Sequence, residues 1–426
     1  MKKNFKLMLF ALAAMTAGFT SCSNEGDENL ATGGEKGKFA FSFSPIGLAT
    51  RAIDLNHTAS ESAVTNVTLF VYRTNGSLER IDNFVAADLS FNTGTGVWSL
   101  NAGKEVEVIA ETNKSVYVGV NMPATLVSAI QGKAGAGMSM ASAYDEALAT
   151  MTAPSNFTMF SDRVELVDVT AGATANTTNI AVSRLAAKVS VKYDNTKLTG
   201  GSVSVAGGTI ALSSLKWAVE NQNPEFRILS PYGTSAFSPD FSWTATPAGD
   251  YQVIAGDNPG ATPAVDDDAV YVMENVPDVS NSPLSDVVTY VRLRCVFTPS
   301  QLLDGAGNSA GAGTPGTTFW TVPNPSGGVA YFGTLAHANA WLAANNPSAA
   351  VSTYTNGECD YGIFINRTAG KYDVVRNHYY AVTIEAINGI GIPTDPNTPI
   401  DPTAKGKLDF ALKVNNWVPN SSNEQI

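Results

Sequence analysis

The sequence LDFALKVNNWV, residues 408–418, decides how the rest of the chain is interpreted. Leu408, Phe410, Leu412 and Val414 recur at every second position, and this alternation is typical of a β-strand with one apolar face. An isolated strand cannot bury that face or pair its backbone in water. The pattern therefore indicates a strand that pairs with a sheet formed by other residues.

The stretch before this strand, GIPTDPNTPIDPTAKGK, is punctuated by proline. Pro393, Pro396, Pro399 and Pro402 recur every third residue, which is also the repeat of a polyproline II helix. This spacing favours a stiff spacer that holds the terminal strand away from its own copy, and the alternative is a disordered linker. Residues 393–426 are thus expected to form a spacer and a terminal strand.

A second strand pattern lies near the beginning, in GKFAFSFSPIG. Phe39, Phe41 and Phe43 alternate with small residues, and a proline stops the run. The loop LATRAIDL follows, with Arg51 before Ala52. Loops of small residues are preferred sites of proteolysis, so this loop suits an arginine-specific protease.

The first residues resemble a secretion signal. Three lysines precede the apolar run LMLFALAAMTAGF, which is too short to span a membrane, and residues 1–21 are therefore expected to be removed. Cys22 lies where a lipoprotein signal places the cysteine that receives lipid; the alternative is a plain signal peptide. The acidic residues just after Cys22 suit either a surface-export signal or a solvated tether.

The middle of the chain reads as mostly strands. Asn75 and Gly76 predict a hairpin turn, residues 123–150 suggest short helices, and TLAHANAWLAAN predicts an amphipathic helix. A boundary is expected near residue 205. The fold class is therefore all-β with a few short helices, in two β-sandwiches that cover residues 52–205 and 206–392 after a tether and strand at 22–51.

The charge of the chain limits the kinds of molecule that it is expected to bind. The chain has 426 residues and a formal net charge of −12, which disfavours nucleic acid because phosphate would be repelled. Loss of residues 1–51 removes six basic and four acidic residues, so the mature charge becomes −12 − 6 + 4 = −14. Cys295 and Cys359 could bridge in an oxidising compartment or remain as two buried thiols.

No catalytic constellation is apparent. His57, His337 and His378 are isolated from one another and show no metal spacing, and no nucleotide or hydrolase motif occurs. Asp266, Asp267 and Asp268 are adjacent, so their side chains diverge and a solvated loop is favoured over a calcium site. We expect neither enzymatic activity nor a cofactor.

The two isolated strands suggest one shared site. If the strand at Phe39–Phe43 fills a groove in the first domain, a cut after Arg51 severs its link to that domain. The emptied groove then exposes apolar side chains and unpaired backbone, and the terminal strand of another copy can replace what was lost. Head-to-tail addition of this kind does not close on itself and builds a filament.

The order of motifs along the chain resembles the fimbrillins, the type V pilins of Bacteroides-type bacteria. The resemblance rests on Cys22, the strand at 38–44, TRA at 50–52, NVTLFVY at 66–72, RLAAKVSV at 184–191, LKWAVENQN at 215–223, VVRNHYYAVTI at 374–384 and VNNWV at 414–418. It implies two tandem transthyretin-like domains, a lipid-anchored precursor at the outer membrane, and cleavage between Arg51 and Ala52. It also implies a donor strand from Leu408 to Trp417.

The resemblance therefore predicts a shaft subunit of a cell-surface fimbrium. Its implied partners are copies of itself, other fimbrial subunits such as anchor and tip, and an arginine-specific protease. One rival is a tip or accessory surface lipoprotein that binds glycan or protein and keeps its lipid. A second rival is a secreted hydrolase, which turnover dependent on His337 or His378 would favour.

Overall fold

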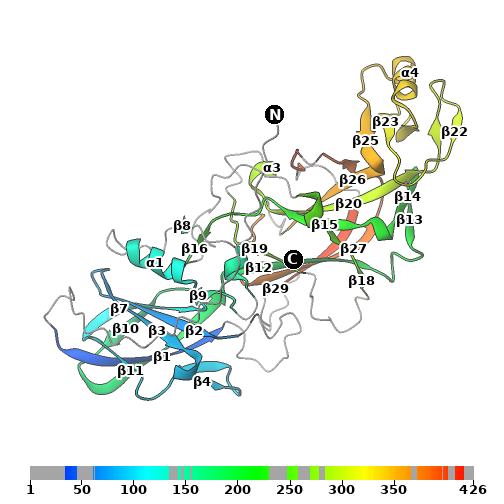
Figure 1. Cartoon of the computed structure of the whole chain (residues 1–426). Helices are drawn as coiled ribbons and strands as arrows, with labels where there is room; N and C mark the ends of the chain where they lie inside the picture. Colours follow the sequence, from blue (N-terminus) through cyan, green and yellow to red (C-terminus); the bar gives the residue numbers. More distant parts are fainter. Residues whose placement is uncertain are drawn as a thin grey trace, which may run out of the picture. The chain divides into compact units, whose positions relative to one another are not determined.

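The protein is known from a computed structural model. The structure describes residues 34–45, 61, 63–133, 143–144, 148–153, 156–229, 247–257, 269–277, 284–365, 372–395, 397–401 and 408–416. Within these ranges the chain is mostly β, with a few short helices and several sheets, as the sequence predicts (Figure 1). The described helices include none with the length and hydropathy needed to cross a membrane.

The first sheet contains the strand predicted near the beginning. Its strands pair in the order β3-β2-β7-β9-β11-β1-β5-β4, with β10 on β7 and β6 on β1. The bounds are β1 Lys36–Pro45, β2 Asn66–Tyr72, β3 Leu78–Val85, β4 Leu89–Asn92, β5 Val97–Leu100, β6 Val106–Ile109, β7 Glu111–Val120, β9 Met159–Ser161, β10 Glu165–Val169 and β11 Gly172–Arg184.

The turn between β2 and β3 forms where the sequence predicts it. Gly76 adopts a φ of 82°, which side chains with a Cβ rarely tolerate, and its N–H donates to the Arg73 carbonyl over 2.8 Å. The Asn75 side chain accepts from the Ser77 N–H over 2.9 Å. The two strands that this turn connects, β2 and β3, pair antiparallel along their length.

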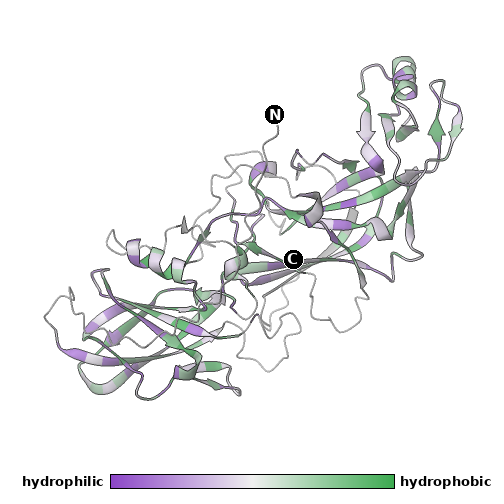
Figure 2. Cartoon of the chain, in the orientation of Figure 1, coloured by the Kyte–Doolittle hydropathy of each residue, from purple (hydrophilic) through white to green (hydrophobic). Residues whose placement is uncertain are grey.

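Two further sheets enclose the largest core. One pairs as β18-β12-β27-β29 with β19 on β12; the other pairs as β13-β14-β20-β15-β17, with β26 on β20 and β28 on β26. Their bounds are β12 Ala186–Asp194, β13 Ser202–Val205, β14 Gly208–Ala211, β15 Lys216–Glu220, β17 Gln252–Val253, β18 Gly256–Asp257, β19 Val270–Met273, β20 Tyr290–Pro299, β26 Glu358–Phe364, β27 His378–Ile387, β28 Ile392–Pro393 and β29 Leu408–Asn416. Buried side chains of both sheets belong to one hydrophobic cluster. Many strands of these sheets alternate between apolar and polar residues (Figure 2).

A fourth sheet lies in the sequence between β20 and β26. It pairs as β22-β21-β24-β23-β25 and carries helix α4, Leu335–Asn345. Its strands are β21 Leu302–Leu303, β22 Ser309–Gly311, β23 Phe319–Pro323, β24 Val329–Phe332 and β25 Ser352–Tyr354. The helix begins after Thr334, whose hydroxyl accepts from the His337 N–H, as expected for an N-cap. Trp341 on the helix packs against Phe332 on the sheet.

Strand pairing passes from the first sheet to the next at Leu185, between β11 and β12. The short helices predicted over residues 123–150 form only in part: α2 spans Leu148–Met151, but Ala143–Tyr144 form β8, which pairs with β16, Phe226–Arg227. Tertiary pairing overrides local helix propensity in so short a segment.

The remaining helices are short. They are α1 Ala124–Lys133 and α3 Leu284–Val287, with single 3₁₀ turns at Ala86–Asp88, Leu212–Ser214, Ala248–Asp250 and Thr355–Gly357. Helix α1 covers the segment ATLVSAI, which the sequence assigned to a helix, and it buries Leu126 and Ile130.

Candidate functional site

Strand β1 lies in the interior of the first sheet and is bonded along both of its edges. One edge pairs in parallel with β11, from Gly37 opposite Gly172 to Pro45 opposite Val182. The other edge pairs antiparallel with β6 and then with β5, where Ser42 faces Ser99. Removing β1 would therefore leave two rows of unpaired backbone groups facing an open slot.

The apolar face of β1 is fully buried. Phe39, Phe41 and Phe43 expose 1%, 2% and 0% of their surface and belong to the core of the first sheet. Phe43 stacks on Trp98 and Phe41 meets Phe84 edge to face. Burial of one such side chain contributes roughly 1.5–3 kcal/mol, so these three residues hold β1 firmly while it remains in place.

The outer face of β1 makes polar contacts. The Ser42 hydroxyl donates to Asn179 Oδ1 over 3.0 Å, and the Asn176 side chain donates to the Lys38 carbonyl over 2.9 Å. Lys36 and Glu107 approach within 3.8 Å, but both are exposed and such a pair contributes little. The hold on β1 is therefore mainly apolar packing and backbone pairing.

Strand β29 lies against its own chain. It pairs antiparallel with β27, from His378 opposite Asn416 to Ile387 opposite Leu408, and no further described strand bonds its other edge (Figure 1). Phe410 is half-buried and packs against the large core. The terminal strand was expected to project away from its own copy, and the structure instead holds it on β27 of the same chain, although not in the slot that β1 occupies.

The proline-rich segment explains that difference. β28 pairs with β26, and Ile400 is 4% exposed beside Tyr290 and Phe364. The Ile400 N–H donates to the Tyr290 hydroxyl over 3.0 Å. The segment thus docks on the sheet as far as Ile400, whereas the sequence favoured a spacer that projects outward; Pro396 and Pro402 lie outside the described residues.

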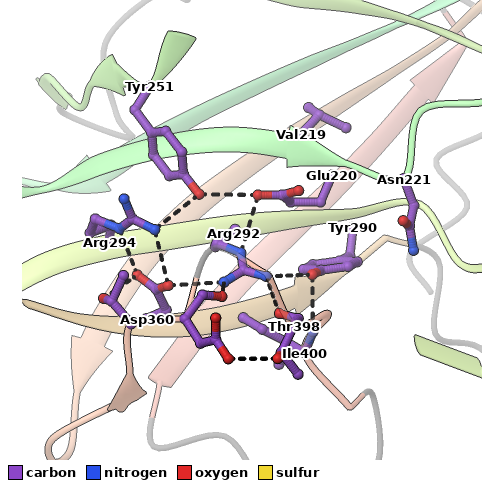
Figure 3. A network of polar contacts seen from close by, with 12 residues as sticks. Val219, Glu220, Asn221, Tyr251, Tyr290, Arg292, Arg294, Asp360, Thr398 and Ile400 are labelled. Atoms are coloured by element: carbon purple, nitrogen blue, oxygen red, sulfur yellow. Dashed lines mark hydrogen bonds and ion pairs between the residues drawn. The ribbon is translucent and has the colours of Figure 1, made fainter. Parts of the chain in front are cut away.

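The side chain of Arg292 on β20 holds the docked proline-rich segment by hydrogen bonds to the backbone of that segment (Figure 3). Its guanidinium donates to the Asp395 carbonyl over 3.1 Å and to the Thr398 carbonyl over 2.8 Å. The same guanidinium contacts Asp360 over 3.0 Å and Glu220 over 3.1 Å.

Further contacts tie the cluster together. Arg294 donates to Asp360 over 2.9 Å, and the Tyr251 hydroxyl donates to Glu220 over 3.0 Å. The Thr394 hydroxyl donates to Asp360 over 3.0 Å. Two arginines thus balance the charge of the buried carboxylates, and Arg292 also donates hydrogen bonds to backbone carbonyls of the proline-rich segment.

The sequence contained a signal for this cluster. Arg292 and Arg294 occupy alternate positions in the otherwise apolar strand VTYVRLRCVF, which places both on one face. Charged residues on a strand that is nearly continuously apolar point to buried partners. Which carboxylates would match them could not be read locally, because Asp360 and Glu220 are remote in sequence.

Cys295 and Cys359 face each other across β20 and β26, with their sulfur atoms 3.4 Å apart. Both are free thiols and both are buried. The hydrogen bond with Cys359, together with burial, raises the pKa of Cys295 well above its ordinary value. Of the two sequence-based alternatives, the structure has two buried thiols, placed directly beside each other.

Several predicted positions lie outside the described residues, namely Cys22, Arg51, Ala52, His57, Asp266, Asp267, Asp268 and Trp417. The last described residue before the Arg51 loop is Pro45, and Glu61 is described after it. Glu61 is fully buried and contacts Lys188 over 3.1 Å. Both ends of that loop are therefore anchored to the body by noncovalent contacts.

Histidine and carboxylate chemistry is limited. His337 lies in the first turn of α4, and His378 Nδ1 lies 2.8 Å from the Arg376 carbonyl oxygen at the start of β27. Across the residues that the structure describes, no group of three His, Cys, Asp or Glu could hold a metal ion.

Comparison with known protein families gives a match in the C-terminal part of the chain. Residues 352–423 match the family described as major fimbrial subunit protein type IV, fimbrillin, C-terminal. This part of the chain is similar to the C-terminal domain of fimbrillins. The matched residues run from β25 through β29, so they include both the segment held by Arg292 and the terminal strand. The match agrees with the expectation of a structural protein and not an enzyme.

Comparison with solved structures gives matches that extend over most of the chain. A candidate cell adhesion protein from Parabacteroides distasonis ATCC 8503 has a TM-score of 0.50 at 15% identity, over 90% of this chain and 99% of that one. The tip fimbrial protein Mfa3 from Porphyromonas gingivalis has a TM-score of 0.42 at 14% identity, over 89% and 100%. A fimbrial assembly protein from Parabacteroides distasonis has a TM-score of 0.43 at 12% identity, over 90% and 97%. No curated protein sequence matches the chain.

Proposed function

We propose that this fimbrillin is a shaft subunit of a cell-surface fimbria that polymerises by donor-strand exchange. Its precursor is anchored through lipid at Cys22, and an arginine-specific protease cuts between Arg51 and Ala52. β1 then leaves the first of two tandem transthyretin-like domains. β29 of another copy enters the slot, so the polymer grows head to tail.

The position of β1 carries this proposal. β1 is an interior strand that is bonded on both edges. Its covalent connection to the next described strand runs through the loop that contains Arg51. A cut in this loop leaves β1 held by side-chain burial and backbone pairing alone. Exchange for another strand of similar pattern then needs no other covalent change.

Strand pairing also supports the direction of exchange. In its own chain β29 is an edge strand, bonded only to β27 among the described strands. In the slot it would be bonded to β11 on one edge and to β5 and β6 on the other. Each additional backbone hydrogen bond contributes about 0.5–1.5 kcal/mol, so transfer from an edge to an interior position favours the polymer.

The test uses purified precursor treated with an arginine-specific protease. We expect a mature N-terminus at Ala52 by mass spectrometry and a polymer ladder on a gel run without boiling. Arg51→Ala precursor should remain monomeric with β1 in place. A monomer after complete cleavage at Arg51 would contradict the proposal.

A tip or accessory adhesin is the second candidate, and the fourth sheet favours it. Strands β21–β25 and α4 have a hydrophobic cluster of their own, and strand exchange has no need of them. Gold labelling of this subunit on cells separates the two candidates. Label along the whole fibre indicates a shaft subunit, and label confined to fibre ends indicates a tip subunit.

A further inference from the structure

Two stretches of the chain share a short pattern that begins with glycine between lysines. Lys36-Gly37-Lys38 opens β1, and Lys405-Gly406-Lys407 immediately precedes β29. Apolar residues follow at every second position in both cases. The two stretches read KGKFAFSFSP, residues 36–45, and KGKLDFALKV, residues 405–414.

The glycine of β1 occupies a place that excludes any side chain. Gly37 is buried, and a Cβ built there would overlap the Thr170 carbonyl oxygen. The same Cβ would lie 2.8 Å from Val169 Cγ1 and 3.0 Å from the Thr170 carbonyl carbon. Because Thr170 contributes backbone and not a flexible side chain, this contact cannot be relieved by a rotamer change. A strand that fills the slot therefore needs glycine at this position.

We propose that Gly406 of the incoming copy takes the place of Gly37 and thereby sets the register and direction of the donor strand. This inference rests on the proposed strand exchange. Leu408, Phe410 and Leu412 then take the places of Phe39, Phe41 and Phe43, and the strand runs parallel to β11, as β1 does. Gly406 lies outside the described residues, and its part here comes from the sequence.

Other registers fail at the glycine. A shift by two residues keeps the apolar face inward but brings Leu408 or Ala404 to the place of Gly37, and each has a Cβ. A shift by one residue in either direction turns Asp409 toward the core, together with Lys413 or Lys407.

The reversed direction fails in the same way. If Leu412, Phe410 and Leu408 fill the three phenylalanine places in that order, Val414 falls on the place of Gly37. If Gly406 is kept there instead, Ala404 and Pro402 would replace Phe39 and Phe41, and most of the apolar burial would be lost.

The proposed register also lengthens the ladder. Val414 falls on the place of Pro45, where β1 ends opposite Val182. Proline has no N–H to donate to a ladder, whereas valine has one. β29 continues to Asn416, so the incoming strand can pair two residues beyond the end of β1, alongside the last residues of β11.

Paired cysteines test the register directly. Ser42 faces Ser99 on β5, and in the proposed register Ala411 takes the place of Ser42. In a chain with Ser99→Cys and Ala411→Cys, oxidation after protease treatment should give covalent polymers that survive boiling and dissolve on reduction. The matched controls pair Ser99→Cys with Asp409→Cys or Lys413→Cys, which lie on the same strand face two residues away.

The outcomes distinguish a failure of the proposed register from a failure of the proposed strand exchange. Polymers that are covalent only with the Ala411 variant support the proposal, and stronger cross-linking through position 409 or 413 overturns it while strand exchange stands. If protease-treated protein forms no polymer ladder even before oxidation, the proposed function itself fails.

A glycine variant gives an independent readout. Gly406→Val should slow formation of the polymer ladder at least about tenfold, because overpacking at a rigid contact is costly. The matched control is Lys407→Val, which adds the same side chain at the adjacent position, facing outward as Lys38 does. Equal rates for the two variants would overturn the assignment of Gly406.

Discussion

Arg292 Nη2 lies 2.8 Å from the Thr398 carbonyl oxygen, and this hydrogen bond ties strand β20 to the segment that leads to β29. Together with the bond to the Asp395 carbonyl, it holds two positions of this segment against β20. A guanidinium presents several donors in a fixed plane, which suits it to hold two carbonyls and two carboxylates at once.

Arg292→Met should destabilise the protein and release the tail. The substitution leaves Asp360 and Glu220 without one of their buried cationic partners, which typically costs about 3–5 kcal/mol. Thermal unfolding gives the stability, and hydrogen exchange at residues 394–400 reports the docking of the segment. Lys197→Met serves as the control, because Lys197 is half-exposed and pairs with Glu385 at the surface. Equal protection of the segment in both variants would show that Arg292 does not hold it.

Phe41→Ala should weaken the precursor but not the cleaved polymer. The Phe41 side chain is 2% exposed in the first core, and truncation of such a residue typically costs about 3–5 kcal/mol. Because β1 is absent from the polymer in the proposed mechanism, the polymer should melt as in the wild type. Differential scanning calorimetry of precursor and polymer makes the comparison, with Ala40→Ser on the opposite face as the control. A matching loss in the polymer would show that β1 stays in place.

Phe410→Asp should leave a folded monomer that cannot polymerise. A carboxylate on the inner face of the donor strand would be buried without a partner in the slot, which is strongly unfavourable. Circular dichroism checks the fold, and the polymer ladder after protease treatment checks assembly. Asp409→Asn, on the outer face of the same strand, is the matched control and should polymerise normally. Intact ladders with Phe410→Asp would count against β29 as the donor.

Gly37→Val should loosen β1 before any cleavage. The added side chain would press on the Thr170 carbonyl, so β1 should occupy its slot less stably. We expect a lower melting temperature of the precursor and faster polymer formation once the loop is cut. The control is Lys38→Val, next to it on the outer face. A precursor as stable as the control would mean that the local backbone adjusts without cost.

Alkaline pH should destabilise the protein in part through its buried thiols. The pKa of Cys295 is raised above its ordinary value of 9.0, mainly by the hydrogen bond with Cys359 and by burial. The unfolded chain therefore releases this proton first, so the contribution is present below about pH 9 and is lost as the pH rises above it. Desolvation raises the pKa of Tyr361 in the same direction.

Urea unfolding at about pH 8 and pH 10 measures this effect. The wild-type free energy of unfolding should fall between the two, and a variant with Cys295→Ala and Cys359→Ala should fall less. The decline that remains in the variant belongs to tyrosines such as Tyr361. An identical decline in both proteins would show that the thiols do not contribute.

The strand character of β1 and β29 could be predicted from the sequence alone. Alternation along Phe39, Phe41 and Phe43 predicted β1, and the same pattern from Leu408 predicted β29, because a period of two is a local property of an extended chain. The Asn75–Gly76 turn and helix α4 were predictable for the same reason, since a turn dipeptide and an N-cap act over a few residues.

Pairing partners were decided only by the tertiary structure. β29 lies on β27 of its own chain, with the proline-rich segment held against the sheet by Arg292, Tyr290 and Asp360, although proline spacing alone favoured a stiff spacer that projects outward. Cys295 meets Cys359 only through the register of β20 with β26. These contacts join residues far apart in the sequence, and a local pattern specifies which face of a strand is apolar but not which distant surface will cover it.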